Sequence, residues 1–440
     1  QVPYLLFYPD RNRDDVPDAD PRVLLKGFGM QDAQSLANHL TWGPDGWLYG
    51  LNGSTTTCRI RGIEFQQGCW RYHPPTDRFE LFCEGGGNLF GLTFDAYGRL
   101  FYSSNGGLFY HAVQGGYFAK SFAKHGPLHH LHTYGHFQAV HPSSLEGGPT
   151  TGGIIYRGNT FPRRFHGRFL CGNFLGHTCS WWDVRMADSS VAATFKNILL
   201  DSHDSWFGPT DLCSGPGGTV YVSDFHDRRT AHPDPDAKWD RSNGRIYRIE
   251  AKGTSFSSKI DIGRLESHRL VDPLSHPDGW FADRARIEMA SRRDPEIVPR
   301  LKQLALQREN RQLALQGLWA LHVTSGLDDT LAEKLLRHPA PFVRSWTVRL
   351  LGDRRKVSRR MGQQLVRLAS AERHPVVLVQ LAASARRLPA GESLPVVRTL
   401  LERRPQVADP RLPLMTWWTL EQHALTATDD VLGLFSEDSA

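Results

Sequence analysis

The chain has 440 residues, of which 40% are hydrophobic and 22% are charged, so it is long enough for two or three domains with sizeable cores. It contains no apolar run near the roughly 18 residues that a membrane-spanning helix needs, and no nucleotide-binding loop, Gly-x-Ser-x-Gly elbow or nucleic-acid-binding motif. The net charge of +6 comes from residues 255–440, because residues 1–254 carry equal numbers of basic and acidic side chains. Solvated helix faces account for such a surplus of arginine.

Residues 10–20 form an acidic segment between two strand-like runs. Oxygen-bearing side chains at its positions one, three, five and nine follow the spacing of a calcium-binding loop. These candidate ligands are Asp10, Asn12, Asp14 and Asp18. However, Asp15 stands where such loops have glycine, and Pro21 stands where they have glutamate. A solvated acidic turn is therefore the alternative to a structural calcium site.

Four segments share one pattern, and they are residues 40–52, 92–104, 161–173 and 212–224. Each contains a glycine that opens a run of aromatic and β-branched residues, and in three of them a strand-like run also precedes that glycine. A strand, a glycine-containing turn and a second strand form a β-hairpin. Hairpins at intervals of roughly 50 to 70 residues are typical of the blades of a β-propeller. The pattern therefore predicts a β-propeller over residues 1–254.

Both ends of such a hairpin lie on one rim, so residues just before the first strands and just after the second strands converge on one mouth. Carboxylate, amide and imidazole groups in a polar funnel suit a sugar or a hard cation. The catalytic candidates are His39, Asp211 and Asp224, and the substrate-binding candidates are Asn38, Asn52, Asn88, Asn173 and His226. The alternative is that these side chains bind the backbone where strands end.

A histidine-rich segment lies between the second and third hairpins, where a long insertion is a common place for functional loops. Its candidate ligands are His129, His130, His132 and His136. These imidazoles suit zinc, copper or iron. They equally suit a sugar site together with Tyr134, or structural packing, and the sequence leaves the three interpretations open.

Six cysteines all lie in the first half of the chain, without a Cys-x-x-Cys or Cys-x-x-Cys-His motif. This spacing argues against a zinc ribbon, a thioredoxin-like pair and attached haem. Cys58 with Cys69, and Cys171 with Cys179, are candidate disulfides of an exported protein. Buried free thiols are the alternative, and the sequence does not decide the pairing.

From about residue 255 glycine becomes rare and helical periodicity begins. Residues 338–351 and 374–388 repeat one pattern, a proline-containing turn that leads into an amphipathic helix, at a spacing of 36 residues. This spacing is typical of HEAT-like repeats. We therefore expect a linker over residues 255–280 and an all-α HEAT-like solenoid over residues 281–440, which presents a surface or braces the propeller.

The combination of these motifs resembles the membrane-bound dehydrogenase family of planctomycetes and verrucomicrobia. The resemblance covers nearly the whole chain and is carried by residues 42–50, 87–95, 156–162, 244–249 and 318–321. In that family a propeller similar to six-bladed quinoprotein sugar dehydrogenases precedes HEAT repeats and, commonly, a cytochrome c module. The resemblance implies an exported, periplasmic or membrane-associated protein. Because only four full blades are counted and such a ring should close, we expect a propeller truncated at its N-terminus.

Three departures, from the pattern of the quinoprotein enzymes and from that of the planctomycete family, bear on the base and on the cofactor. The histidine base of those enzymes matches Ser35 here, and His39 lies four residues further on. Of their Arg-Asn pair only Asn88 is kept, after Gly87, and the arginine of the last blade is missing from residues 207–211. A quinone with three carboxylates needs cationic groups. These losses make bound pyrroloquinoline quinone doubtful.

Three functions follow from these patterns. The first is a divergent quinoprotein-like oxidoreductase that acts on sugars or alcohols and passes electrons to a cytochrome c, with His39 as the base and Asp211 and Asp224 orienting it or holding a cation. The second is a non-redox propeller that binds or hydrolyses a carbohydrate or lactone, with a cation such as calcium at the mouth. The third is a protein-interaction scaffold. A small carbohydrate is the expected ligand, and neither nucleic acid nor haem is expected in this chain.

Overall fold

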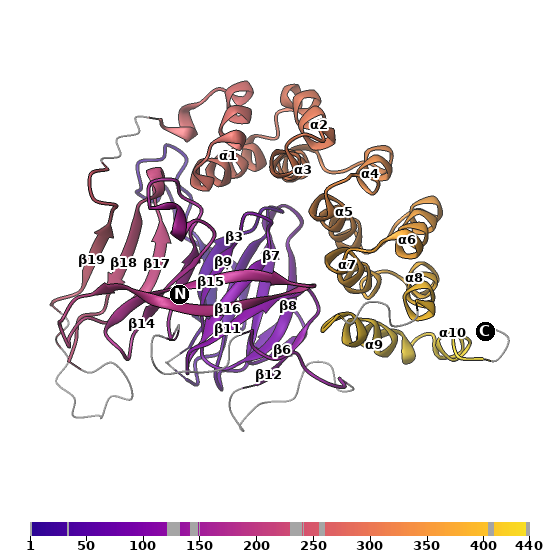
Figure 1. Cartoon of the computed structure of the whole chain (residues 1–440), viewed down its shortest axis with the longest axis horizontal. Coiled ribbons are helices and arrows are strands. Elements are labelled where there is room, and N and C mark those ends of the chain that lie inside the picture. The colour runs from indigo at the N-terminus through magenta and orange to yellow at the C-terminus, as the bar shows by residue number, and fades with distance from the viewer. Residues whose placement is uncertain are drawn as a thin grey trace.

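The computed structural model describes residues 2–32, 35–120, 133–140, 148, 150–228, 240, 242–254, 260–403 and 409–436. The strands occupy the N-terminal part of the chain, and the helices form an arc that lies along one side of them (Figure 1). Within those ranges no helix is both long enough and apolar enough to cross a membrane.

Four sheets make up most of the N-terminal half. The first sheet holds β3 (Asn38–Trp42), β4 (Leu48–Asn52), β7 (Gly68–His73), β8 (Arg78–Gly86) and, in parallel at its edge, β12 (Tyr117–Lys120). The second sheet holds β9 (Leu89–Phe94), β10 (Leu100–Ser104) and β11 (Leu108–Ala112). The third sheet holds β13 (Gly153–Ile155), β14 (Phe169–Asn173), β15 (Thr178–Ala187) and β16 (Ser190–Asp201), and the fourth holds β17 (Pro209–Ser214), β18 (Val220–Asp224) and β19 (Arg245–Ile249). Two smaller pairs are β1 (Tyr4–Phe7) with β2 (Arg22–Lys26), and β5 (Cys58–Ile60) with β6 (Ile63–Phe65).

The predicted hairpins are present as β3–β4, β9–β10 and β17–β18. In the remaining segment, residues 161–173, a 3-10 turn at Arg163–Phe165 replaces the first strand, and β14 pairs with β13 further upstream. That segment is the one without a strand-like run before its glycine. The glycine pattern therefore located the turns correctly, and the side chains before each glycine decided whether a strand precedes it.

The first strand of each sheet lies at a sheet edge, and these edges are neighbours in space. Thr41 Oγ1 of β3 donates a hydrogen bond to a carbonyl of β9, and Thr93 Oγ1 of β9 accepts one from β13. The N–H of Gly152, just before β13, donates to the carbonyl of Thr210 in β17. The sheets thus surround a central space, but the described strands do not close into a ring, so the six-bladed propeller stays a prediction.

The C-terminal half is helical, as predicted, and forms two layers. The inner layer, which faces the sheets, holds α1 (Gly279–Arg292), α3 (Arg311–Ser325), α5 (Pro341–Asp353), α7 (Pro375–Ala385) and α9 (Leu412–Ala424); the outer layer holds α2 (Val298–Leu306), α4 (Asp329–Leu335), α6 (Arg359–Ala371), α8 (Ala390–Glu402) and α10 (Thr428–Leu432) (Figure 1). The two repeated sequence segments are α5 and α7, and each begins at the proline of its pattern. Assignment of these helix pairs to the HEAT class stays a prediction.

The segment predicted as a linker holds 3-10 turns at Ile262–Arg264 and Ser267–Ser275, and α1 follows from Gly279. The second turn buries Leu270, Val271 and Leu274 and packs against α1 and α3. This part of the chain therefore belongs to the helical packing.

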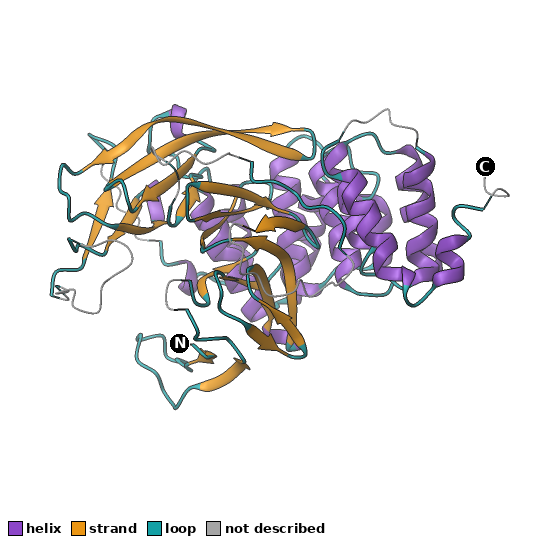
Figure 2. Cartoon of the chain, turned by 90° about the horizontal axis from the view of Figure 1, so that it is seen from below, coloured by secondary structure: helices purple, strands orange, loops and turns teal. Residues whose placement is uncertain are grey.

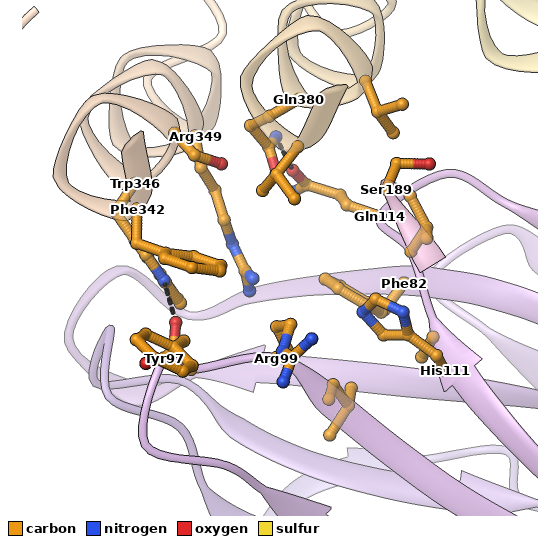
Figure 3. Close-up of a pocket in the computed structure, with 17 residues that line it drawn as sticks. Phe82, Tyr97, Arg99, His111, Gln114, Ser189, Phe342, Trp346, Arg349 and Gln380 are labelled. Carbon is orange, nitrogen blue, oxygen red and sulfur yellow. Dashed lines mark hydrogen bonds between the residues drawn. The ribbon is translucent and has the colours of Figure 1, made fainter. Parts of the chain in front are cut away.

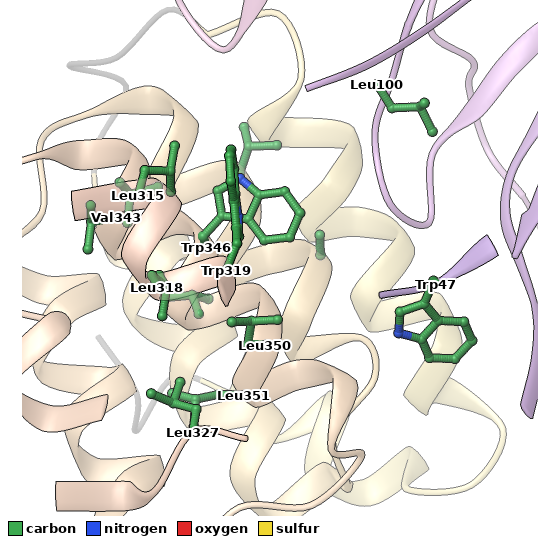
Figure 4. Packing of buried hydrophobic residues seen from close by; sticks show 14 of the residues in the cluster. Trp47, Leu100, Leu315, Leu318, Trp319, Leu327, Val343, Trp346, Leu350 and Leu351 are labelled. Carbon is green, nitrogen blue, oxygen red and sulfur yellow. The ribbon is translucent and has the colours of Figure 1, made fainter. Parts of the chain in front are cut away.

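One hydrophobic cluster extends from the first two sheets into the helices, and it includes Trp47 of the strand side and Trp319 and Trp346 of the inner helices (Figure 4). The turn between β9 and β10 presses on these rings, because a Cβ at Gly98 would lie 2.6 Å from Trp346. Trp346 Nε1–H also donates to the carbonyl of Tyr97 at 2.8 Å. The two halves therefore share one core and are not independent domains joined by a tether.

The long β15–β16 hairpin reaches across the sheets to the helices (Figure 2). At its tip Ser189 donates to Asp409 through its backbone N–H at 2.9 Å and its hydroxyl at 2.7 Å. This contact ties the third sheet to the start of α9.

All six cysteines are free thiols, and only Cys213 is exposed. The alternative of buried thiols therefore holds, and neither predicted disulfide is formed. Cys69 lies opposite Cys83 on the neighbouring strand, and burial raises its pKa.

We expect the free energy of unfolding to fall between pH 7 and pH 5 because of His111. Its buried Nδ1 accepts a hydrogen bond from Arg411 Nη1 at 2.9 Å. Burial lowers its pKa well below the usual value, and the charges of Arg411 and Arg99 lower it further. The unfolded chain takes up this proton near pH 6.5 and the folded chain does not. The contribution of neutral His111 to the free energy of unfolding is therefore fully present above about pH 6.5. Below that pH it is lost, by up to about 1.4 kcal/mol per pH unit.

Chemical denaturation at a series of pH values measures this effect. His111→Gln keeps an acceptor for Arg411 and should flatten the pH dependence. His203→Gln removes an imidazole whose side chain is 87% exposed and should leave it unchanged. An equal slope in the wild type and His111→Gln would show that other groups cause the dependence.

Candidate functional site

A cavity of about 400 Å³ lies between the first strands of the four sheets and the inner helices. Residues of β3, β9, β13 and β17 form its walls, and α1 and α3 close one end with Trp280, Asp283, Arg286 and Trp319. The cavity is therefore formed by both halves of the chain.

The structure brings two of the three predicted catalytic residues together in this cavity. His39 Nε2 lies 3.1 Å from Asp211 Oδ1. The buried Nε2 atom makes no hydrogen bond in spite of this distance. The side chain of Asp211 is 42% exposed and that of His39 is 15% exposed. Asp211 is thus the member of the pair that a ligand meets, and His39 lies behind it.

Asn38 sets the tautomer of His39. The Asn38 amide nitrogen donates to the carbonyls of Leu36 at 2.6 Å and Leu89 at 3.1 Å, so its oxygen must point the other way. That oxygen lies 2.8 Å from His39 Nδ1, which therefore carries the hydrogen. Nε2 of the neutral ring is then the unprotonated nitrogen, beside Asp211. Asn38, predicted to bind substrate, acts on the imidazole instead.

Gly152 makes the close approach of the pair possible. A Cβ at this position would lie 1.9 Å from Asp211 Oδ1 and 2.9 Å from His39 Nε2. Only glycine leaves room for both side chains. The sequence analysis missed this residue, although two consecutive glycines before a short strand are a signal of close backbone approach.

An ion cluster lies at the helical end of the cavity. Asp283 of α1 pairs with Arg157 and with Arg286. Burial raises the pKa of Asp283, but the two guanidinium groups outweigh it and hold the pKa below its usual value. Burial also raises the pKa of Asp278, which lines the same end. Nothing in the sequence connects these helix residues with β3 and β17, so reasoning from motifs missed them.

The lining as a whole is acidic. Four carboxylates face the cavity, from Asp95, Asp211, Asp278 and Asp283, against the two guanidinium groups of Arg157 and Arg286. Both arginines already pair with Asp283. The cavity therefore repels an anion and suits a neutral or cationic ligand.

Asp224 and His226 form a separate pair. Asp224 Oδ1 accepts the N–H groups of Gly208 and His226, each at 2.8 Å, and Oδ2 lies 3.2 Å from His226 Nδ1. Both residues are buried, and neither lines the central cavity. Asp224 thus fixes the loop ends around β17 and β18 and does not orient His39.

The three remaining asparagines also lie outside the cavity lining. Asn52 donates to the carbonyls of Thr56 and Gln66, and the Asn173 oxygen accepts the N–H of Gly176 at 3.0 Å. These contacts follow the alternative in which polar residues bind backbone at strand ends. The side-chain oxygens of Asn52 and Asn88 are buried without a hydrogen-bond partner.

The two predicted metal segments gain no support. Asp10 accepts the N–H groups of Arg13, Asp14 and Asp15, and Asp18 accepts that of Arg11. Asn12 donates to Asp14. The acidic segment is thus a turn that binds its own backbone. His129, His130 and His132 lie outside the described residues, and His136 is exposed. No group of three or more potential metal ligands is found in the part of the chain that is described.

The fold and the cavity define a class of protein in which β-sheets surround a polar central cavity that a helical array closes. A family model described as a domain of unknown function (DUF7133) matches residues 1–253, more than half of the chain. The chain therefore belongs to the DUF7133 family. No curated protein matches the sequence.

Several solved structures are distantly similar. The pyrroloquinoline quinone-bound form of an aldose sugar dehydrogenase from Streptomyces coelicolor is 16% identical with a TM-score of 0.38, over 56% of this chain and 70% of that chain. A glucose dehydrogenase is 14% identical with a TM-score of 0.39, over 56% and 72%. A luciferin-regenerating enzyme is 11% identical with a TM-score of 0.34, over 57% and 72%. These similarities are too distant to bear on the chemistry of the cavity.

Proposed function

We propose that the N-terminal half binds a small carbohydrate or alcohol in the central cavity, and that the Asp211–His39 pair withdraws a proton from one of its hydroxyl groups. This would be the proton-transfer step of a sugar or alcohol oxidation. The single observation that supports it is the 3.1 Å approach of His39 Nε2 to the exposed Asp211 carboxylate inside one cavity.

The two side chains divide the work in this proposal. The Asp211 carboxylate accepts a hydrogen bond from the substrate hydroxyl, because it is the exposed member of the pair. A proton that the pair takes up resides on His39 Nε2, since Nδ1 already carries one and donates it to Asn38. General-base groups of this kind contribute about 10²–10⁴-fold to a rate. Trp42 and Trp280 offer apolar ring surface to the carbon skeleton of the ligand.

Pyrroloquinoline quinone does not fit the residues present. Its three carboxylates need cationic partners, and among the described residues the cavity lining offers only the guanidinium groups of Arg157 and Arg286, which both already pair with Asp283. The side chains of this chain account for the proton alone, so the two electrons of an oxidation need another acceptor. A cytochrome c module is the partner that the resemblance to the planctomycete family suggests, and it would take the electrons one at a time from that two-electron acceptor. We extend the proposal to a six-bladed propeller, to HEAT-like repeats and to export.

We expect Asp211→Asn and His39→Gln to lower turnover of a sugar or alcohol about 10²-fold or more. The assay uses the 440-residue chain, a panel of aldoses and alcohols, and an artificial electron acceptor, with and without added pyrroloquinoline quinone. We expect no dependence on the quinone. Calorimetric titration with the same ligands measures binding separately.

Asp188→Asn is the matched control, because Asp188 is an exposed aspartate in the β15–β16 turn and is not among the residues that line the cavity. It should leave turnover unchanged. Full turnover in Asp211→Asn would show that the Asp211–His39 pair takes no part in the reaction. Ligand binding without turnover for any acceptor would exclude oxidation and leave a binding module.

The acidic lining favours a second candidate, the hydrolysis of a neutral lactone. This reaction needs no cofactor, because the pair would take a proton from water as it attacks the ester carbonyl. Release of acid from sugar lactones, measured with a pH indicator, tests it in the same variants. Loss of lactone hydrolysis in Asp211→Asn, with no oxidation in the wild type, would select this candidate.

A further inference from the structure

A second cavity, of about 70 Å³, lies between helices α5 and α7 and the sheet residues beneath them (Figure 3). Tyr97, Phe342 and Trp346 form an aromatic wall, and the rings of Tyr97 and Phe342 stack with centroids 4.2 Å apart. The two cavities have no lining residue in common. This space is therefore distinct from the central cavity, although its Arg99 pairs with Asp95 of the central cavity.

Two arginines enter this cavity from opposite sides. Arg99 comes from the strand side, just before β10, and Arg349 comes from α5 (Figure 3). Their side chains are only 12% and 8% exposed. Arg99 pairs with Asp95 at 2.6 Å, and Arg349 pairs with Asp45 at 3.1 Å. Neither aspartate lines the cavity, and no carboxylate is among the residues that do.

Both guanidinium groups keep unused hydrogen-bonding capacity. Arg349 Nε is buried and has no hydrogen-bond partner. Arg99 Nη1 contacts the sulfur of Met186, which is a weak acceptor. A buried N–H of a charged group without an acceptor is unfavourable. The two arginines thus keep donors without a charged acceptor at a space whose lining includes no carboxylate.

His111 lines the same cavity. Burial lowers its pKa well below the usual value, and the charges of Arg411 and Arg99 lower it further. The imidazole is therefore neutral and does not compete with the arginines for an anion. The arginine side chains themselves are mostly buried, and a low local dielectric strengthens charged hydrogen bonds.

We propose that this cavity binds one small oxyanion, inorganic phosphate or the carboxylate of a small organic acid, between Arg99 and Arg349. A guanidinium group presents paired N–H donors that match two oxygens of a carboxylate or phosphate. Arg99 belongs to the sheets and Arg349 to the helices, so the bound anion joins the two halves of the chain. Binding to the folded state alone also stabilises it.

The test uses the full chain in a low-salt buffer without phosphate or carboxylate. Calorimetry and thermal unfolding are followed with phosphate, acetate and chloride at equal ionic strength. We expect saturable binding with a stoichiometry of one and a rising unfolding temperature for phosphate or acetate, and the stronger of the two identifies the source of the oxyanion. An equal response to chloride would overturn the oxyanion assignment.

Arg99→Gln and Arg349→Gln should each weaken binding about tenfold or more. Arg344→Gln is the matched control, because Arg344 lies on the same helix, is 16% exposed and pairs with Glu372 outside the cavity. If Arg349→Gln does not fold, the Arg99→Gln variant tests the proposal by itself. This variant is expected to fold, because Asp95 still accepts the backbone N–H groups of residues 97 and 99. No binding by the folded wild type, unchanged affinity in Arg99→Gln, or equal weakening in Arg344→Gln would each overturn the proposal.

Discussion

Replacing Arg71 with methionine is expected to lower the free energy of unfolding by about 3–5 kcal/mol. Arg71 of β7 is fully buried and pairs with Glu80 at 2.6 Å and with Asp353 of α5 at 2.6 Å. Burial raises the pKa of Asp353, but Arg71 and Arg387 outweigh it and hold the pKa far below its usual range. Methionine fills the space and leaves three buried carboxylates, those of Asp45, Glu80 and Asp353, with less compensation. Denaturation followed by tryptophan fluorescence and far-ultraviolet circular dichroism measures the loss.

Arg360→Met is the matched control, because Arg360 pairs with Glu333 on the outer layer and its side chain is 77% exposed. Exposed pairs contribute at most about 1 kcal/mol. Because Arg71 connects the first sheet with α5, we expect strands and helices to lose stability together. A helical transition at the wild-type midpoint in Arg71→Met would contradict a shared core.

Replacing Gly152 with alanine is expected to abolish the arrangement of the proposed site while the protein still folds. The new Cβ would lie 1.9 Å from Asp211 Oδ1, so the exposed carboxylate must rotate away from His39. Gly152 is not among the glycines with positive φ, so alanine suits the backbone. If the pair acts on the substrate, turnover should fall about 10²-fold or more. Activity and unfolding are measured on the same preparation.

Gly391→Ala serves as the control, since a Cβ at Gly391 of α8 meets no atom within 4 Å. It should leave turnover unchanged and stability equal or up to about 1 kcal/mol higher. A folded Gly152→Ala variant with wild-type turnover and ligand affinity would show that the His39–Asp211 approach is not the functional feature of the cavity.

The shared core gives the helical half a direct part in the central cavity. Trp280, Asp283 and Arg286 of α1 close one end of the space that the strands surround. The helices therefore shape what the cavity accepts, beyond bracing the sheets. Both halves of the chain therefore contribute to one cavity.

Local sequence predicted the elements of this protein well. The hairpin at residues 92–104 and the helix after Pro375 were predicted because turn glycines and helical periodicity act over a few neighbouring residues. The location of His39 and Asp211 at the starts of first strands was also predictable, since a hairpin brings both of its ends to one rim. Their pairing was a hypothesis, because it depends on how four sheets are arranged.

The sequence by itself determined the strands, the turns, the change to helices near residue 255 and the polar residues at the strand ends. Only the tertiary structure decided which of those polar residues face a cavity. Asp224 and Asp211 look alike in sequence, yet Asp224 is buried against its own loop and Asp211 is exposed beside His39. The difference depends on Gly152 and on α1, which are distant along the chain and carry no local signal of their partners. Long-range packing, unlike a turn, leaves no short motif in the sequence.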